Sequence, residues 1–158
     1  MRVGLLSDVH ANSEALDAVL RDMSPVDSIV CAGDIVGYNP MPAECVSAVR
    51  ERAEVIVQGN HDDAVEHPAK VSGNQMAYSG IQQARSGLSP DQREWLKDLP
   101  QQTTFSEGDY LVVHSHPEKP GQYVFPDQFE DLAPYTGSYE GIILGHTHIQ
   151  HKEWVGDT

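Results

Sequence analysis

The chain has 158 residues and a formal net charge of −14, because 24 acidic residues stand against only 10 Lys and Arg. Its length suits one compact domain, and none of its apolar runs approaches the ~20 residues that a membrane helix requires. A strongly negative surface repels nucleic-acid backbones, which argues against duplex DNA as a partner. We therefore expect residues 1–158 to form a single domain that binds neither a membrane nor duplex nucleic acid.

The N-terminus and the cysteines favour a cytoplasmic protein. The first strand becomes polar at Ser7 and Asp8, too soon for a secretory signal peptide. Cys31 and Cys45 have neither disulfide-framework nor zinc spacing, so we expect two reduced thiols that pack as small hydrophobic side chains.

The charge composition leaves two interpretations open. Only four residues are Lys. An acid-rich, Lys-poor surface suits a salty cell interior, because salt screens the repulsion between like charges. A halophilic source is therefore one interpretation, and an ordinary acidic protein is the other.

The first sixty residues alternate short apolar runs with amphipathic segments. Residues 15–23 place apolar side chains along one helical stripe, and Asn12 or Ser13 can cap that helix. A second helix is expected over residues 42–50. Three buried strands are expected over residues 3–7, 27–32 and 55–57. This alternation predicts a parallel sheet covered by helices.

The second half of the chain predicts further helices and antiparallel strands. Residues 75–85 favour a helix, and Ser89 with Gln92 forms a capping box that should open another helix, ending near Leu99. A hairpin at Glu107-Gly108 should join two strands. The remaining expectations are strands over 102–106, 109–114, 141–144 and 149–155, and a long loop over 115–137 with a helical turn at 127–132.

Polar clusters follow several of these strands. A parallel sheet binds its ligands outside the carboxyl ends of its strands, so the clusters should meet at one edge. They contain seven candidate metal ligands, namely Asp8, His10, Asp34, Asn60, His114, His146 and His148. The first two and the last two form i, i+2 pairs, so both members of a pair can face the same side.

The residue types in these clusters indicate a pair of divalent ions. Imidazole, carboxylate and amide oxygen suit first-row divalent metals, and the lack of a thiolate argues against a structural zinc site. Seven ligands exceed the need of one tetrahedral ion, but with one shared carboxylate they supply two. Each motif alone could be an ordinary turn. Because all of them occur at strand ends, we interpret them together as a site for two divalent ions.

With these motifs, the sequence resembles the calcineurin-like metallophosphoesterases. The resemblance spans residues 8 to 148, and the stretch Gly33 to Pro42 resembles the bacterial and archaeal branch of phosphodiesterases. That branch is distantly related to diadenosine tetraphosphatases and Ser/Thr phosphatases. The matching segments follow the family's order: Asp8-Val9-His10, Gly33 to Gly37, Gly59 to Asp62, His114, and Gly145 to His148.

The resemblance implies a fold and a set of ligand roles. The fold would be a sandwich of two mixed β-sheets flanked by helices. Asp34 would bridge two metal-binding groups, with Asp8, His10 and His148 in one and Asn60, His114 and His146 in the other. Mixed nitrogen and oxygen ligation favours Mn²⁺, while Fe, Ni and Zn are alternatives.

The implied reaction is metal-dependent hydrolysis of a phosphate ester. A hydroxide that bridges the two ions would attack phosphorus, and His61 would protonate the leaving alkoxide. Asp62 would either orient His61 or cap a helix after the turn, and both roles are left open. His116 could compete with His114 as a ligand, but His114 directly follows the apolar run 111–113 and is preferred. Tyr38 and Asn39 are expected to line the pocket.

The substrate is expected to be a small phosphodiester or a nucleotide phosphoanhydride. No Arg or Lys adjoins the motifs, which favours a diester over the phosphate dianion of a monoester. The alternatives are a phosphomonoesterase or protein phosphatase, a structural metalloprotein, and a non-catalytic binding scaffold. The complete ligand set argues against the scaffold.

The C-terminus departs from the family pattern. Family members usually continue well past the Gly145 to His148 motif, whereas this chain ends ten residues after His148. An incomplete and a naturally short C-terminus are both open. Either would leave an unpaired sheet edge that invites pairing with another chain, so a homo-oligomer is also expected.

The halophilic interpretation predicts that salt stabilises the protein. Between low and molar KCl, screening of the −14 charge should raise the midpoint of urea unfolding, measured by circular dichroism. An unchanged or lower midpoint in molar KCl would favour the ordinary acidic protein instead.

Overall fold

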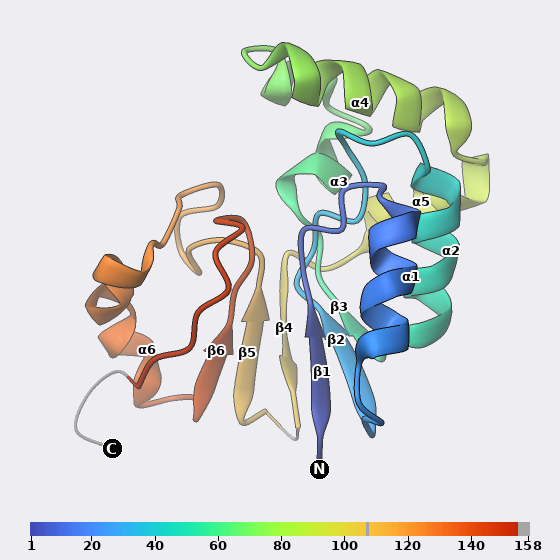
Figure 1. The fold of residues 1–158 in the computed structure, drawn as a ribbon. Coiled ribbons are helices and arrows are strands. Elements are labelled where there is room, and N and C mark those ends of the chain that lie inside the picture. Colours follow the sequence, from blue (N-terminus) through green and yellow to red (C-terminus); the bar gives the residue numbers. More distant parts are fainter. Residues whose placement is uncertain (107, 155–158) are drawn as a thin grey trace.

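The computed structural model describes residues 1–106 and 108–154. Two three-stranded sheets stand beside each other, and helices cover the side of the first sheet that faces away from the second (Figure 1). The α-helices are α1 (Ser13–Asp22), α2 (Pro42–Arg52), α3 (Asn60–Ala64), α4 (Gln75–Gly87), α5 (Pro90–Asp98) and α6 (Ala133–Thr136). Two 3₁₀ helices are η1 (Pro68–Val71) and η2 (Pro126–Leu132).

The first sheet is parallel, as the alternation of strands and helices predicted. It contains β1 (Val3–Leu6), β2 (Ser28–Cys31) and β3 (Val55–Ile56), with β2 in the centre. The last residues of the three strands are aligned, since Leu6 pairs with Cys31 and Cys31 pairs with Ile56. All three strands therefore release their following loops at the same edge.

The second sheet is mixed. It contains β4 (Gln102–Phe105), β5 (Tyr110–Val113) and β6 (Gly141–Ile143). β4 and β5 are antiparallel, which confirms the predicted hairpin, although Glu107 in its turn lies outside the described residues. β5 and β6 are parallel, so the ends that precede His114 and Gly145 also lie at one edge.

Alternation along β2 divides the core into two parts. Val30 and Ala32 face the second sheet, where they pack with Phe105 and Val112. Cys31 points the other way and packs under the helices. Burying a valine side chain of this kind contributes roughly 1.5–3 kcal/mol. Both cysteines are free and buried, as the sequence predicted.

Local capping signals set the starts of two helices correctly. The Asn12 side chain accepts a hydrogen bond of 3.0 Å from the Ala15 amide at the start of α1. At α5, the Ser89 hydroxyl accepts from the Gln92 amide at 3.2 Å, and the Ser89 amide donates to the Gln92 side chain at 3.1 Å. These contacts satisfy amides that the first helical turn leaves without a partner.

Three short elements were not predicted, and one predicted strand was wrong. α3, η1 and α6 are too short to produce a helical period in the sequence. Residues 149–154 alternate in polarity but form no strand, and Val155 lies outside the described residues. Their side chains are exposed, Trp154 by 75%, and no neighbouring strand within the described part of the chain pairs with them.

No helix in the described ranges has the length and apolar character that a membrane crossing requires.

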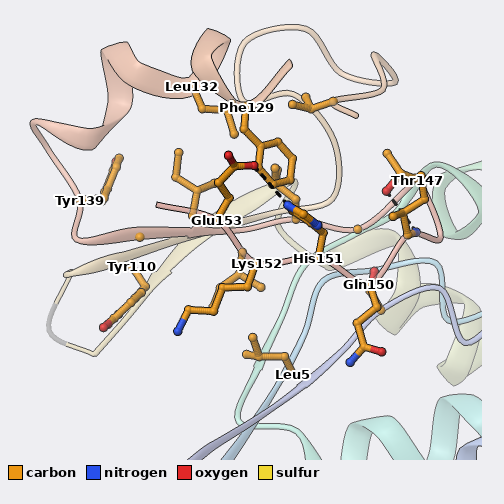
Figure 2. A pocket seen from close by; sticks show the side chains of 18 of the residues that line it. Leu5, Tyr110, Phe129, Leu132, Tyr139, Thr147, Gln150, His151, Lys152 and Glu153 are labelled. Carbon is orange, nitrogen blue, oxygen red and sulfur yellow. Dashed lines mark hydrogen bonds and ion pairs between the residues drawn. The ribbon is translucent and has the colours of Figure 1, made fainter. Parts of the chain in front are cut away.

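The free edges of the two sheets border a hollow of about 1430 Å³. Among the described residues, β1 pairs only with β2 and β6 only with β5. Leu5, Tyr110, Phe129 and Leu132 contribute to the walls of the hollow (Figure 2).

The homo-oligomer that we expect from the unpaired sheet edge stays a prediction. A single species of monomer mass in sedimentation velocity, at concentrations up to about 100 μM, would contradict it.

Candidate metal centre

Hydrogen bonds beyond the strand ends draw the functional loops together. The His10 amide donates to the Asp34 carbonyl at 2.9 Å, and the Ala11 amide donates to the Ile35 carbonyl at 2.8 Å. In the second sheet, the Gly145 amide donates to the His114 carbonyl at 3.0 Å. The strand pairing therefore continues into the loops and holds their side chains in register.

Five of the seven predicted ligands have a left-handed backbone. Their φ angles are 55° at Asp8, 50° at His10, 53° at Asp34, 71° at His146 and 57° at His148. Non-glycine residues rarely adopt this conformation, which costs of order 1–3 kcal/mol per residue. Each of these residues lies just after a strand, where the chain turns sharply and presents a side chain at the sheet edge.

The first predicted ligand group comes together as expected. Asp8, His10 and His148 offer ligand atoms that all lie within 4.8 Å of one another. Nε2 of His148 is 3.3 Å from Oδ1 of Asp8 and 3.0 Å from Nε2 of His10. These contacts join loops that are 138 residues apart in the sequence.

The second predicted group also comes together, and it contacts Asp34. Asp34, His114 and His146 form one cluster by the same 4.8 Å criterion. Nε2 of His114 is 3.3 Å from Oδ2 of Asp34 and 3.0 Å from Oδ1 of Asn60. The same Asp34 oxygen is 3.8 Å from Nε2 of His10, so this carboxylate lies between the two groups.

Backbone carbonyls fix the orientation of three histidine rings. Nδ1 of His10 donates to the Val36 carbonyl at 3.2 Å, and Nδ1 of His114 donates to the Ala32 carbonyl at 2.8 Å. At His146 it is Nε2 that bonds a carbonyl, that of Gly121, at 3.1 Å. A carbonyl only accepts, so the bonded nitrogen carries the proton and the other nitrogen of a neutral ring keeps its lone pair.

The geometry and chemistry of these donors fit divalent metal ions. The lone pair of His10 Nε2 faces His148 Nε2 at 3.0 Å, with the Asp8 carboxylate beside them. Without an ion, an Nε2–H of His148 can donate to this lone pair; a divalent ion would instead bind both ring nitrogens together with the carboxylate. Imidazole nitrogen with carboxylate and amide oxygen is a suitable ligand set for Mn, Fe, Ni or Zn.

His114 and Asp34 form a charged pair in the centre. Burial alone would lower the pKa of His114, but its hydrogen bond with Asp34 and the attraction of that carboxylate raise it to about 9. Burial would raise the pKa of Asp34, yet His114 holds it below its usual value. Burial lowers the pKa of His10, His61 and His146, so these rings are neutral at pH 7.

His61 lies beside both ligand groups. Its amide donates to Oδ1 of Asp34 at 2.8 Å, and its ring centroid is 4.8 Å from that of His10. The ring packs against Gly37, which has a φ of 101°; a Cβ at this glycine would be 2.3 Å from Nδ1 of His61. Nδ1 is buried and has no hydrogen-bond partner among the described residues.

Asp62 has the capping role rather than the orienting role. One carboxylate oxygen accepts from the amides of Ile35 and Val36 at 2.9 and 3.1 Å. The other accepts from the Gly59 amide at 2.9 Å, at the start of α3. Both oxygens are thus bonded to backbone amides, and the idea that Asp62 orients the His61 ring is not supported by contact. It instead ties the loop after β2 to the loop after β3.

The structure distinguishes His114 from His116. Nδ1 of His116 accepts from the Glu118 amide at 3.2 Å, and its ring packs against Tyr135. Of these two histidines, only His114 belongs to a described group with Asp34. The preference for His114 rested on its position directly after the strand, and the geometry agrees.

Two aromatic side chains flank the centre, and sequence reasoning missed one of them. The ring of Tyr38, which was expected to line the pocket, lies 4.8 Å from that of His10 and 4.7 Å from that of His61. Tyr123, the missed residue, stacks on His146 at 4.1 Å with an angle of 13° between the rings. Burial raises the pKa of Tyr38, with further contributions from Tyr123 and Asp34. Tyr123 lies in an irregular loop, where no sequence period marks which face a side chain takes.

A hollow of about 470 Å³ adjoins the first ligand group. Asp8, His10 and His148 form part of its wall, together with Tyr38 and Asn39. The amide group of Asn39 donates to the His10 carbonyl at 2.9 Å and thereby supports the loop that carries this ligand. Asp8 and His148 also line the larger hollow at the sheet edges, together with Lys152.

The calcineurin-like phosphoesterase superfamily domain matches residues 1–158. The chain therefore belongs to the calcineurin-like phosphoesterases, as its motifs indicated.

Three known proteins are similar to this chain. An uncharacterised protein of Methanocaldococcus jannaschii is 32% identical over 154 residues, covering 93% of this chain and 62% of its own. The crystal structure of a metallophosphoesterase from Sphaerobacter thermophilus is 36% identical with a TM-score of 0.77, covering 94% of this chain and 61% of its own. A hypothetical protein from Pyrococcus horikoshii OT3, at 18% identity and a TM-score of 0.72, covers 90% and 68% and supports the fold alone. This chain thus spans less than two thirds of the length of the first two relatives.

We expect metal binding to release protons at neutral pH. The raised pKa of His114, about 9, keeps a proton on that ring in the metal-free protein at pH 7. The ring must lose this proton before its nitrogen can bind an ion. Calorimetric titration with Mn²⁺ in buffers of different ionisation enthalpy measures the release. At pH 10, above the raised pKa, this release should vanish. Equal release at both pH values would contradict the assignment.

Proposed function

We propose that the protein hydrolyses phosphate esters at a centre for two divalent ions, with phosphodiesters as the preferred substrates. The observation that carries the proposal is the position of Asp34 between two ligand groups. Its Oδ2 is 3.8 Å from His10 of one group and 3.3 Å from His114 of the other. A carboxylate in this position can be shared by two ions, and membership of the phosphoesterase family supports this chemistry.

The chain would contribute a set of metal ligands that are already in position. Bound divalent ions would supply an activated water and neutralise negative charge on the phosphoryl oxygens. The carbonyls of Ala32 and Val36 keep the free nitrogens of His114 and His10 directed at the centre. Because the rings are already oriented, little reorganisation is needed when a substrate binds. Mn²⁺ is the ion that we propose first.

His61 is the proposed general acid. Its ring is adjacent to that of His10 and is not a member of either ligand group that we assign. Burial lowers its pKa, but a bound phosphate ester would add negative charge nearby and favour the protonated ring. As the bond between phosphorus and the leaving oxygen breaks, His61 would donate its proton to that oxygen. The attacking water supplies the proton that restores the ring.

The preference for a diester rests on the charges in the smaller hollow, of about 470 Å³. No Arg or Lys occurs among the described residues that line the hollow beside Asp8, His10 and His148. Enzymes that act on monoesters often bind the terminal phosphate dianion with such cationic side chains. A diester carries only one negative charge, so it needs less compensation.

The experiment is hydrolysis of an aryl phosphodiester and the matching monoester, with and without Mn²⁺, in molar KCl. We expect cleavage that depends on Mn²⁺, with a higher kcat/KM for the diester. Faster cleavage of the monoester would contradict the diester preference. Cleavage of neither ester by folded protein that binds about two Mn²⁺ per chain would contradict the proposed activity.

The same assay tests His61 by substitution. His61→Ala should lower kcat by about 100-fold or more for a diester with a poor alkoxide leaving group, and much less for a nitrophenolate, which needs no proton. His67→Ala is the matched control, because the His67 side chain is exposed and pairs with Asp63. Equal effects of His61→Ala on both leaving groups would remove the acid role.

A further inference from the structure

The hollow of about 470 Å³ beside the first ligand group has many apolar side chains in its wall, and the hydrolysis step has no use for them. Apart from the ligands, much of its wall is apolar, with Leu16 and Val19 from α1 and Met76 from α4. Val19 and Met76 are 47% and 73% exposed. Pockets for small organic molecules commonly have 300–1,000 Å³ and mainly apolar walls, so the hollow is the right size for a ligand group.

Tyr38 provides a fixed aromatic wall between the hollow and the metal centre. Its ring contacts His10 edge-on, at an angle of 76°, and also contacts His61. The ring is nevertheless 37% exposed, so part of it remains available. A ring that is already held in place loses little conformational freedom when a flat group packs on it.

The wall of this hollow offers no cationic side chain to a second phosphate group. No Lys or Arg lies among its described residues. A polyphosphate tail would therefore enter it without compensation, in a chain whose net charge is −14. An uncharged group needs no such compensation. Asn12 and Asn39 also line the wall. Oδ1 of Asn12 accepts from the Ala15 amide and Nδ2 of Asn39 donates to the His10 carbonyl, so Nδ2 of Asn12 and Oδ1 of Asn39 are the atoms that can pair with the edge of a heterocycle.

From these observations we infer that the hollow binds the uncharged, planar nucleobase of a nucleoside phosphodiester against Tyr38 and Val19. The inference rests on the proposed function and narrows its substrates to diesters that carry such a group. Phosphorus would then lie beside Asp8, His10 and His148, because these residues belong to both the hollow and the ligand group.

The test is binding of adenosine and of inorganic phosphate to the Mn²⁺-loaded protein, measured by titration calorimetry or ligand-observed NMR. Adenosine carries the planar group without charge and reports on the hollow, while phosphate reports on the metal centre. Ribose, which lacks the base, is the ligand control. Because binding needs no turnover, the result separates failure of this inference from failure of the proposed hydrolysis.

Tyr38→Ala should weaken adenosine binding about tenfold, which is the usual effect of losing one aromatic stacking partner. Tyr38→Phe keeps the ring and should restore the affinity. Val19→Glu, on the exposed face of α1, should also weaken adenosine by placing a charge at the rim. Tyr78→Ala is the matched control, because Tyr78 is 40% exposed on α4 and outside the hollow.

Each result of these binding measurements either supports or overturns the inference. Weaker adenosine binding in Tyr38→Ala and Val19→Glu, with phosphate binding by Val19→Glu within about twofold of wild type, supports the inference. Adenosine that binds wild type no better than ribose overturns it. So does adenosine binding that is unchanged in Val19→Glu, even if Tyr38→Ala fails to fold.

Discussion

One carboxylate, that of Asp34, contacts residues from most of the loops that form the centre. One of its oxygens accepts from the His61 amide at 2.8 Å, and the other is 3.3 Å from Nε2 of His114. Its backbone carbonyl accepts from the His10 amide. The loops after β1, β2, β3 and β5 are therefore positioned relative to a single buried residue. A displacement of Asp34 would disturb both ligand groups and the proposed acid together, so the rest of the site depends on this residue.

The surrounding backbone holds this arrangement under strain. Left-handed residues at the ends of β1 and β2 are costly, and they persist only where other contacts over-determine them. Asp62 supplies such contacts, because its buried carboxylate satisfies the amides of Ile35, Val36 and Gly59. Leaving three buried amides unpaired would cost several kcal/mol. These contacts position the loops without help from a ligand, as a preorganised centre requires.

The negative charge of the protein disfavours binding of the anionic substrate that we propose. Bound divalent ions would provide the missing attraction. A chain of net charge −14 repels an anionic substrate at long range. The smaller hollow beside the first ligand group contains no Lys or Arg in its described residues, so attraction for phosphate on that side would come from bound ions. An uncharged aromatic group in the adjoining hollow would add affinity without adding repulsion. The hollow would then recognise the aromatic group, while the neighbouring ions would bind the charged phosphate.

The sequence by itself determined the strands, the capped helices and the seven donors that the structure gathers at the strand ends. These features depend on local periodicity, on caps within a few residues, and on the rule that parallel strands end at one edge. Tertiary structure alone decided that Asp62 ties two loops together, that the ring of His61 packs on Gly37, and that Tyr123 stacks on His146. It also decided that residues 149–154 form no strand, since a strand needs a neighbour to pair with. These outcomes depend on contacts between distant segments, and no local pattern encodes them.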